Sequence, residues 1–221
     1  MKNIVIAIDG FSGTGKSSTA KEVAEKLGYT YIDSGAMYRA TTLFFLQHKV
    51  DIGDKGNVQR VLDDLRLDFE TNEILINNQP VSDQIRTMQV NDNVSHVAAL
   101  KEVRVEMVKQ QQLMGKSKRV VMDGRDIGTV VFPQAELKVF MTANVDVRAA
   151  RRQKELEVQG VNEELSVIKS NLIERDRLDS SRKESPLIKA EGAIEIDTSY
   201  LSFEDQVSKI VDLAKAKIHG N

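Results

Sequence analysis

Short apolar runs alternate along most of this chain with segments whose apolar residues recur at helical spacing. The first run, 4–8, reads Ile-Val-Ile-Ala-Ile, which is typical of a buried parallel strand. Ala20, Val23 and Leu27 then predict a helix, which is expected to end at Gly28. Because strands alternate with helices, we predict an α/β fold with a doubly wound, five-stranded parallel sheet. The other four strands are expected at 29–33, 119–123, 137–141 and 193–197.

The pattern changes between the second and third of these strands. A short helix is expected around Val58 and Leu62, followed by short strands that turn-forming residues separate. We therefore predict a small antiparallel insert over 66–86. Its strands are expected at 67–69, 74–76 and 80–81, with turns at 70–73 and 77–78. The other helices are expected at 36–48, 88–98, 101–114, 165–179 and 203–218, together with one that begins at Asp146 and breaks at Gln159-Gly160.

The composition excludes several classes of protein. Of the 221 residues, 41% are hydrophobic and 29% charged, which is ordinary for a globular domain. A net charge of -2 and only 5% aromatic residues do not favour a nucleic-acid polymer as partner. There is no cysteine, and His48, His96 and His219 are far apart, so neither disulfides nor a zinc site is predicted. No apolar run approaches the ~20 residues that span a bilayer, and we expect a cytoplasmic monomer without a membrane partner.

Residues 10–17 read Gly-Phe-Ser-Gly-Thr-Gly-Lys-Ser, the G-x-x-x-x-G-K-[ST] pattern of a phosphate-binding loop, or P-loop. Its glycines permit a tight turn whose backbone N–H groups form a nest for phosphate oxygens. Lys16 is expected to reach the β- and γ-phosphates, and Ser17 to ligate Mg²⁺. The strand–loop–helix context favours a nucleotide site over a turn that binds nothing. The expected ATP-binding residues are Gly10, Phe11, Ser12, Gly13, Thr14, Gly15, Lys16, Ser17 and Ser18, with Arg151 from a later helix.

A second polar cluster, Asp123-Gly124-Arg125-Asp126, follows the third predicted strand. Ligands bind at the carboxyl ends of strands in open α/β sheets, which favours a site here over an ordinary polar loop. Asp123 can orient the water shell of a nucleotide-bound Mg²⁺, or it can simply cap the next turn.

Arginines are concentrated in two later segments. Arg148, Arg151 and Arg152 form either a solvated helix face or a mobile flap over phosphates. Further on, Arg175 and Arg182 share one helical face with an aspartate, which suits either a surface ion-pair lattice or the binding of phosphate and ribose.

Phosphoryl transfer requires in-line positioning and charge neutralisation more than it requires a general base. An acceptor phosphate is already anionic, which agrees with the absence of an obvious catalytic histidine. A GTPase switch would carry D-x-x-G after the second strand and N-K-x-D late in the chain, and neither is found. The alternative to a kinase with a phosphorylated acceptor is a P-loop kinase for another small acceptor, such as a sugar acid.

Several motifs together resemble the bacterial cytidylate kinases, a family of P-loop nucleoside monophosphate kinases. They are the stretch 8–17, D-S-G-A-M-Y-R at 33–39, I-R-T at 85–87, D-G-R-D-I-G-T-V-V-F-P at 123–133, and E-R-D at 174–176 with Asp179 and Arg182. The resemblance covers nearly the whole chain and implies transfer of the γ-phosphoryl group of ATP to CMP or dCMP with Mg²⁺. It implies one kinase domain, 1–221, with a core (1–33, 100–147 and 180–221), a monophosphate-binding region (34–99) and a lid (148–179).

The resemblance also implies roles for individual residues. The monophosphate would be held by Ser34, Arg39, Arg125, Arg175 and Arg182, with Arg175 and Asp179 near the sugar. Cytosine would be read by Ser95, Arg104 and Asp126, with Tyr38 in the same CMP site, because a carboxylate can accept from the exocyclic amine. Arg148, Arg151 and Arg152 resemble lid arginines that close over ATP. The implied catalytic residues are Lys16, Arg125, Arg148, Arg151, Arg175 and Arg182, and the implied metal-site residues are Ser17 and, through water, Asp123.

One position departs from the family pattern. Phe11 follows the first loop glycine, where many relatives carry proline. Its backbone N–H adds a donor, so little effect on phosphate binding is expected.

Overall fold

The computed structural model describes residues 2–70, 73–158 and 160–220, which form two compact units. The sheet unit spans Met1–Tyr31 and Lys118–Asn221, and the helical unit spans Ile32–Ser117. Among the described residues, no helix has both the length and the apolar character that a membrane crossing requires.

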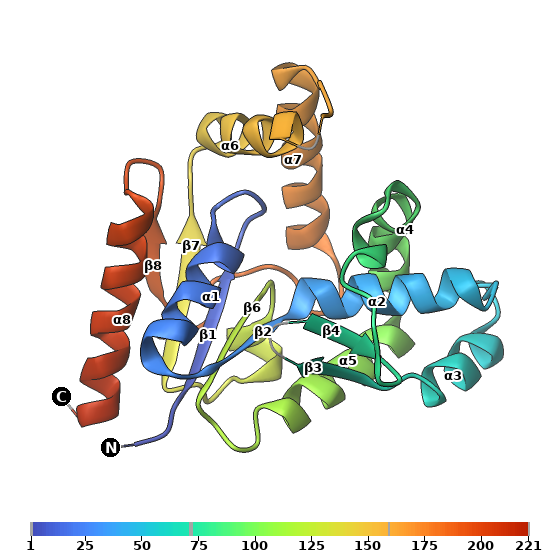
Figure 1. The fold of residues 1–221 in the computed structure, drawn as a ribbon, viewed down its shortest axis with the longest axis horizontal. Helices are drawn as coiled ribbons and strands as arrows, with labels where there is room; N and C mark the ends of the chain where they lie inside the picture. Colours follow the sequence, from blue (N-terminus) through green and yellow to red (C-terminus); the bar gives the residue numbers. More distant parts are fainter. Residues whose placement is uncertain (1, 71–72, 159, 221) are drawn as a thin grey trace. The chain divides into compact units, whose positions relative to one another are not determined.

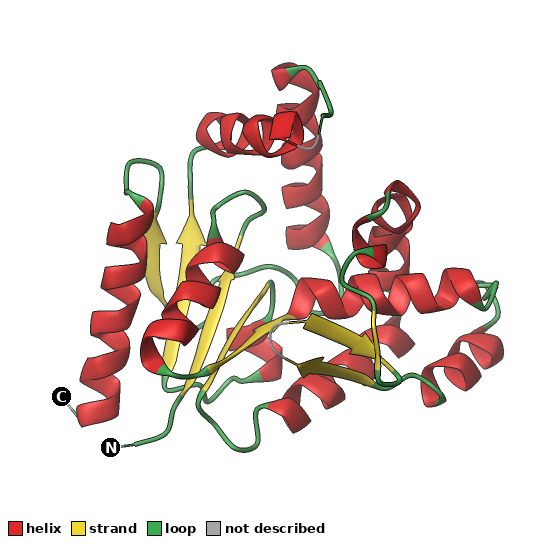
Figure 2. Cartoon of the chain, in the orientation of Figure 1, coloured by secondary structure: helices red, strands yellow, loops and turns green. Residues whose placement is uncertain are grey.

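The sheet unit is built on a five-stranded sheet with the order β2-β6-β1-β7-β8 (Figures 1 and 2). β1 pairs in parallel with β6 on one side and β7 on the other, and β8 pairs in parallel with β7. From β1 the chain builds one side of the sheet and then the other, so the doubly wound parallel sheet that the sequence predicts is confirmed. The order reverses at β1, and such a switch point places a crevice at the carboxyl ends of the strands.

The core of the sheet unit follows from the alternation of residues along β1. Ile4, Ile6 and Ile8 point into one buried cluster, which α1 and α8 complete. Every residue of β1 is buried, because the strand has neighbours on both edges. The predicted end of the first helix is confirmed, since Gly28 has φ 64° and its N–H caps α1 at Ala24 and Glu25.

Apart from one π-helical turn that was not predicted, the elements of the sheet unit lie close to their predicted positions. They are β1 (Val5–Gly10), α1 (Lys16–Leu27), β2 (Thr30–Asp33, which leads into the helical unit), β6 (Val120–Gly124), the π-helical turn η2 (Ile127–Val131), β7 (Leu137–Thr142), α6 (Val145–Val158), α7 (Leu165–Ser181), β8 (Ile194–Asp197) and α8 (Phe203–His219).

Helices α6 and α7 pack on each other as a helix pair that follows β7 (Figure 1). Their small apolar cluster contains Ala149, Ile168 and Leu172. The predicted break at 159–160 falls partly outside the described residues, because Gln159 is not among them; Gly160 itself has φ +76°.

The helical unit contains the predicted antiparallel insert, a three-stranded sheet with the order β3-β4-β5. Asn77 and Asn78, with φ 49° and 66°, form the predicted turn between β4 and β5, and asparagine tolerates this left-handed conformation. The turn predicted at 70–73 includes residues 71–72, which lie outside the described residues. The elements are α2 (Ser34–Gln47), α3 (Lys55–Asp63), β3 (Leu67–Glu70), β4 (Glu73–Ile76), β5 (Gln79–Pro80), the 3₁₀ turn η1 (Gln84–Arg86), α4 (Met88–Ala99) and α5 (Lys101–Met114).

Candidate active site

The P-loop, 10–17, connects the end of β1 to the start of α1, as its sequence context predicts. Gly13 and Gly15 have φ values of +78° and +85°, a region that residues with side chains rarely adopt. A Cβ on Gly10 would lie 2.2 Å from the carbonyl oxygen of Met141 on β7. The glycines are therefore required both by the backbone conformation of the loop and by the close approach of the neighbouring strand.

Two side chains close the loop on itself. Lys16 donates from Nζ to the carbonyl oxygen of Phe11 at 3.1 Å, and Thr14 donates from Oγ1 to the same oxygen at 3.0 Å. Lys16 is buried, which strengthens its field on a bound anion because water screens it less. The ammonium group thus lies against the backbone of the loop that a phosphate would meet.

Asp123 lies at the end of β6, directly beside the start of α1. Its carboxylate accepts from Ser17 Oγ and from Tyr31 OH, each at 2.8 Å. A hydroxyl and a carboxylate are the hard oxygen ligands that Mg²⁺ prefers, usually with water and nucleotide phosphates completing the shell. In the described part of the chain no group of three or more His, Cys, Asp or Glu residues could hold a metal by itself. The donor set fits a nucleotide-bound Mg²⁺ better than a metal held by protein alone.

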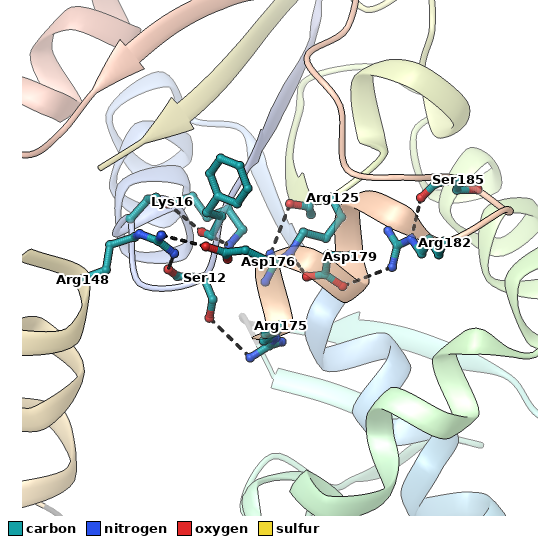
Figure 3. A network of polar contacts seen from close by, with 12 residues as sticks. Ser12, Lys16, Arg125, Arg148, Arg175, Asp176, Asp179, Arg182 and Ser185 are labelled. Atoms are coloured by element: carbon teal, nitrogen blue, oxygen red, sulfur yellow. Dashed lines mark hydrogen bonds and ion pairs between the residues drawn. The ribbon is translucent and has the colours of Figure 1, made fainter. Parts of the chain in front are cut away.

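Asp179 on α7 brings together two of the predicted phosphate-binding arginines (Figure 3). Its carboxylate accepts from Arg125 Nε at 2.8 Å and pairs with Arg182 Nη1 at 3.4 Å. Burial by itself would raise the pKa of Asp179, but the guanidinium groups of Arg125, Arg175 and Arg182 outweigh it and hold the pKa below its usual value. The carboxylate is therefore ionised at neutral pH and organises a strongly cationic cluster.

Arg175 connects this cluster to the P-loop. It lies one helical turn before Asp179 on α7, and its Nη1 donates to Ser12 Oγ at 3.3 Å (Figure 3). The sheet unit thus places the Arg175 guanidinium against a loop built for phosphates, and Asp179 links it electrostatically to Arg125 and Arg182.

The three arginines of α6 have different surroundings. Arg148 is buried, and it donates to the Ser12 carbonyl oxygen at 3.2 Å and to Asp176 at 2.7 Å (Figure 3). Its guanidinium also lies over the ring of Phe11, 5.4 Å from the centroid. The side chain therefore fixes the P-loop against both helices of the α6–α7 pair.

The other two arginines of α6 bind different partners. Arg151 donates to the carbonyl oxygen of Thr198 at 2.6 Å, and Thr198 Oγ1 in turn donates to the Thr14 carbonyl oxygen at 3.0 Å. Arg152 instead forms an exposed ion pair with Glu155 at 3.0 Å. The structure thus brings Arg148 and Arg151 to the P-loop, whereas the recorded ion pair of Arg152 is local to its helix.

The remaining predicted CMP residues lie in the helical unit, except for Asp126, which is buried just after β6 in the sheet unit. Ser34 begins α2, where Asp33 caps the helix by accepting from the Ala36 N–H at 2.9 Å. Arg104 of α5 is buried, and its guanidinium lies 5.5 Å from the centroid of the Tyr38 ring. The helical unit therefore brings Tyr38 and Arg104 together. Arg39 lies on α2, and Ser95 lies exposed on α4.

Asp9, Tyr31 and Thr198 also contact this site, and none of them was singled out from the sequence. The role of Asp9 could have been predicted from the sequence, because a carboxylate that follows an apolar strand directly before a P-loop must find partners in the interior. No sequence pattern indicates the contacts of Tyr31 and Thr198, since their partners are 92 and 184 residues away along the chain.

The family model described as "Cytidylate kinase" matches residues 6–216. The chain belongs to the cytidylate kinase family. A cytidylate kinase from Flavobacterium psychrophilum is 49% identical over 222 residues, covering 96% of this chain and 98% of the relative. Relatives of the same name from Cytophaga hutchinsonii and Phocaeicola vulgatus are 48% and 46% identical, covering 99% and 100% of this chain and 96% and 100% of their own length. The family resemblance inferred from the motifs is confirmed.

A solved structure extends the comparison to the fold. The shikimate kinase from Bacteroides thetaiotaomicron superposes with a TM-score of 0.51 and 12% identity, covering 97% of this chain and 99% of that one. At this identity the likeness concerns the fold alone.

Proposed function

We propose that this chain transfers the γ-phosphoryl group of ATP to CMP or dCMP, giving ADP and CDP or dCDP. Membership of the cytidylate kinase family supports this activity. The observation that carries the proposal is the contact of Arg175 with Ser12, because it joins a cluster of arginines to the P-loop within one unit. Two phosphate-binding devices side by side are what a reaction between two phosphorylated nucleotides requires.

The proposed mechanism assigns the donor to the P-loop. Backbone N–H groups and Lys16 hold the β- and γ-phosphates, and Arg151 lies beside them through Thr198. Ser17 and Asp123, the latter through water, would hold Mg²⁺, which neutralises phosphate charge when bound. Arg148, which the family resemblance implies is catalytic, also donates to the Ser12 carbonyl oxygen and so holds the P-loop in place.

The acceptor is assigned to the arginine cluster. Arg125, Arg175 and Arg182 hold the monophosphate in line with the γ-phosphate, with Ser34 and Arg39 from α2 as further ligands. The acceptor oxygen is anionic at neutral pH, so no general base is needed. Guanidinium groups aimed at the moving phosphoryl group neutralise charge that increases in the transition state, and this lowers the barrier.

Base selection is assigned to Ser95 and Arg104 of the helical unit and Asp126 of the sheet unit. The Asp126 carboxylate accepts a hydrogen bond from the exocyclic amine of cytosine, whereas uracil presents a carbonyl oxygen there and is repelled.

We also propose that 34–99 acts as the monophosphate-binding region and that 148–179 acts as a lid, in a monomer that works in the cytoplasm.

A coupled assay of ADP release with a panel of monophosphates tests the function. We expect turnover with CMP and dCMP, and at least tenfold lower kcat/KM with UMP and AMP. Equal rates with UMP or AMP would contradict the role of Asp126 and leave the kinase class intact. No turnover with any monophosphate would contradict the proposed reaction itself.

A further inference from the structure

A buried carboxylate lies one residue before the P-loop and is not used by the mechanism above. Asp9 is 2% exposed, and its two oxygens accept from the backbone N–H groups of Ile127 at 2.8 Å and Gly128 at 2.7 Å. These bonds join positions 118 and 119 residues apart along the chain. Hydrogen bonds from an N–H to a charged acceptor are roughly twice as strong as neutral ones.

The two sides of this contact differ in how firmly they are held otherwise. On one side, Asp9 pairs with Gly124 of β6 and Phe140 of β7, so strand ladders fix the backbone of β1 on both edges. On the other side, Ile127 and Gly128 begin the irregular turn η2, just after the chain has left β6. Asp9 therefore sets the position of the turn, and the turn does not set the position of Asp9.

Two of the residues assigned to CMP lie directly before the turn. Arg125 and Asp126 immediately precede Ile127, and Asp126 accepts through its carbonyl oxygen from the Val130 N–H at 2.9 Å. A shift of the Ile127 and Gly128 amides would move Asp126 with them. We propose that Asp9 is a positioning residue that holds Arg125 and Asp126 in register with the P-loop, so that the acceptor nucleotide meets the donor. This inference rests on the proposed function.

Glycine at 128 is the counterpart of the carboxylate. A Cβ on Gly128 would lie 3.2 Å from Asp9 Oδ2 and 3.3 Å from the Ala190 Cβ, which is tighter than ordinary contact, so a side chain there presses the turn and Asp9 apart by a few tenths of an ångström. The same coupling can thus be disturbed from either end.

The charge of Asp9 is held at some cost. Burial raises its pKa to about 6, and the Asp126 carboxylate adds to the rise, while the Gly128 and Ile127 N–H groups and the Lys16 ammonium lower it. A buried carboxylate is expensive to ionise, and here the two backbone N–H groups and Lys16 oppose the effect of burial, so that Asp9 is ionised above about pH 6. On protonation one oxygen becomes a donor, and the bond from one of the two amides weakens.

The test compares Asp9→Asn with Asp212→Asn, a control on the exposed face of α8. In Asp9→Asn an NH₂ group replaces one acceptor. We expect about a tenfold rise in KM for CMP and a smaller preference for CMP over UMP, with KM for ATP within about twofold of wild type. Asp212→Asn should match wild type. Equal rises in both KM values, or no change in either, would overturn the positioning role.

A second variant keeps the proposal testable if Asp9→Asn does not fold. Gly128→Ala should raise KM for CMP in the same way, and its effect should not add to that of Asp9→Asn where both variants fold. An unchanged KM for CMP in Gly128→Ala would contradict the proposal.

A readout without substrate separates this proposal from the proposed function. In the nucleotide-free protein, the amide proton shifts of Ile127 and Gly128 should titrate near pH 6 in wild type and stay flat in Asp9→Asn. Nucleotide is left out because its phosphate titrates in the same range.

Hydrogen exchange at these two amides should be at least tenfold faster in Asp9→Asn, with Ile6 and Ile8 unchanged. Wild type that fails to turn over CMP would refute the function alone; unaltered exchange at Ile127 and Gly128 would refute the anchor.

Discussion

Arg148 Nη2 lies 2.7 Å from Asp176 Oδ2, and the same guanidinium donates from Nη1 to the carbonyl oxygen of Ser12 at 3.2 Å. One side chain therefore connects α6, α7 and the P-loop. Because the pair is largely removed from water, its two charges interact strongly, and the loss of either one leaves the other without compensation.

Asp176→Ala should therefore destabilise the protein and loosen the P-loop. We expect a loss of about 3 kcal/mol in the free energy of unfolding, together with a rise in KM for ATP. Urea denaturation and initial rates measure the two effects. Glu174→Ala is the matched control, because it removes an exposed ion pair with Arg177 on the same helix, and it should change neither quantity. Equal stability of the two variants would contradict the connecting role of Asp176.

Lys16→Ala should reduce kcat by about 10²–10³-fold while the protein remains folded. The reason is that the ammonium stabilises charge on the moving phosphoryl group more than it stabilises the fold. Initial rates and far-UV circular dichroism together check this. Lys21→Ala, on the exposed side of α1, serves as control. A kcat within a factor of three of wild type would remove Lys16 from the chemical step.

Asp126→Asn should change base selection. An amide can donate a hydrogen bond to the uracil carbonyl, so the ratio of kcat/KM for UMP over CMP should rise by about 10-fold or more. The panel assay measures this ratio, and Asp63→Asn on the exposed face of α3 is the control. If the ratio stays constant while both rates fall, Asp126 has a structural role and does not read the base.

Asp179 gives a prediction about pH. Its pKa in the folded protein lies below the unfolded value of 3.8, so its contribution to stability is complete above about pH 4 and is lost as the pH falls through the folded value. Asp179→Asn should therefore lower the free energy of unfolding by about 2 kcal/mol between pH 5 and 8. The difference from wild type should shrink as the pH falls below 3.8. Denaturant titrations across this range would contradict the assignment if the difference instead grew in acid.

The sequence predicts the elements well, because local patterns determine them. The helix at 101–114 has the predicted bounds, and the two asparagines at 77–78 form the predicted turn, since both depend on nearby residues. The P-loop could be predicted equally well, because its glycines are required by the backbone of the loop itself.

The partners of individual side chains were harder to predict from the sequence. Arg148, Arg151 and Arg152 look alike in the sequence, yet they pair with Asp176, Thr198 and Glu155 respectively. Only the last of these partners lies on the same helix. Whether each of these arginines meets another element or only its own helix depends on α7 and on the residue after β8, whose placement no local pattern of α6 predicts.

The carboxylate of Asp179 stands among the guanidinium groups of Arg125, Arg175 and Arg182 before any nucleotide arrives. It cancels one of their three charges and keeps them from repelling one another apart. Under the proposed assignment, a monophosphate would meet guanidinium groups that Asp179 already holds in one cluster. Because Asp179 cancels part of the cluster's charge, binding there would depend less on long-range attraction, which ionic strength weakens, than on hydrogen bonds at short range.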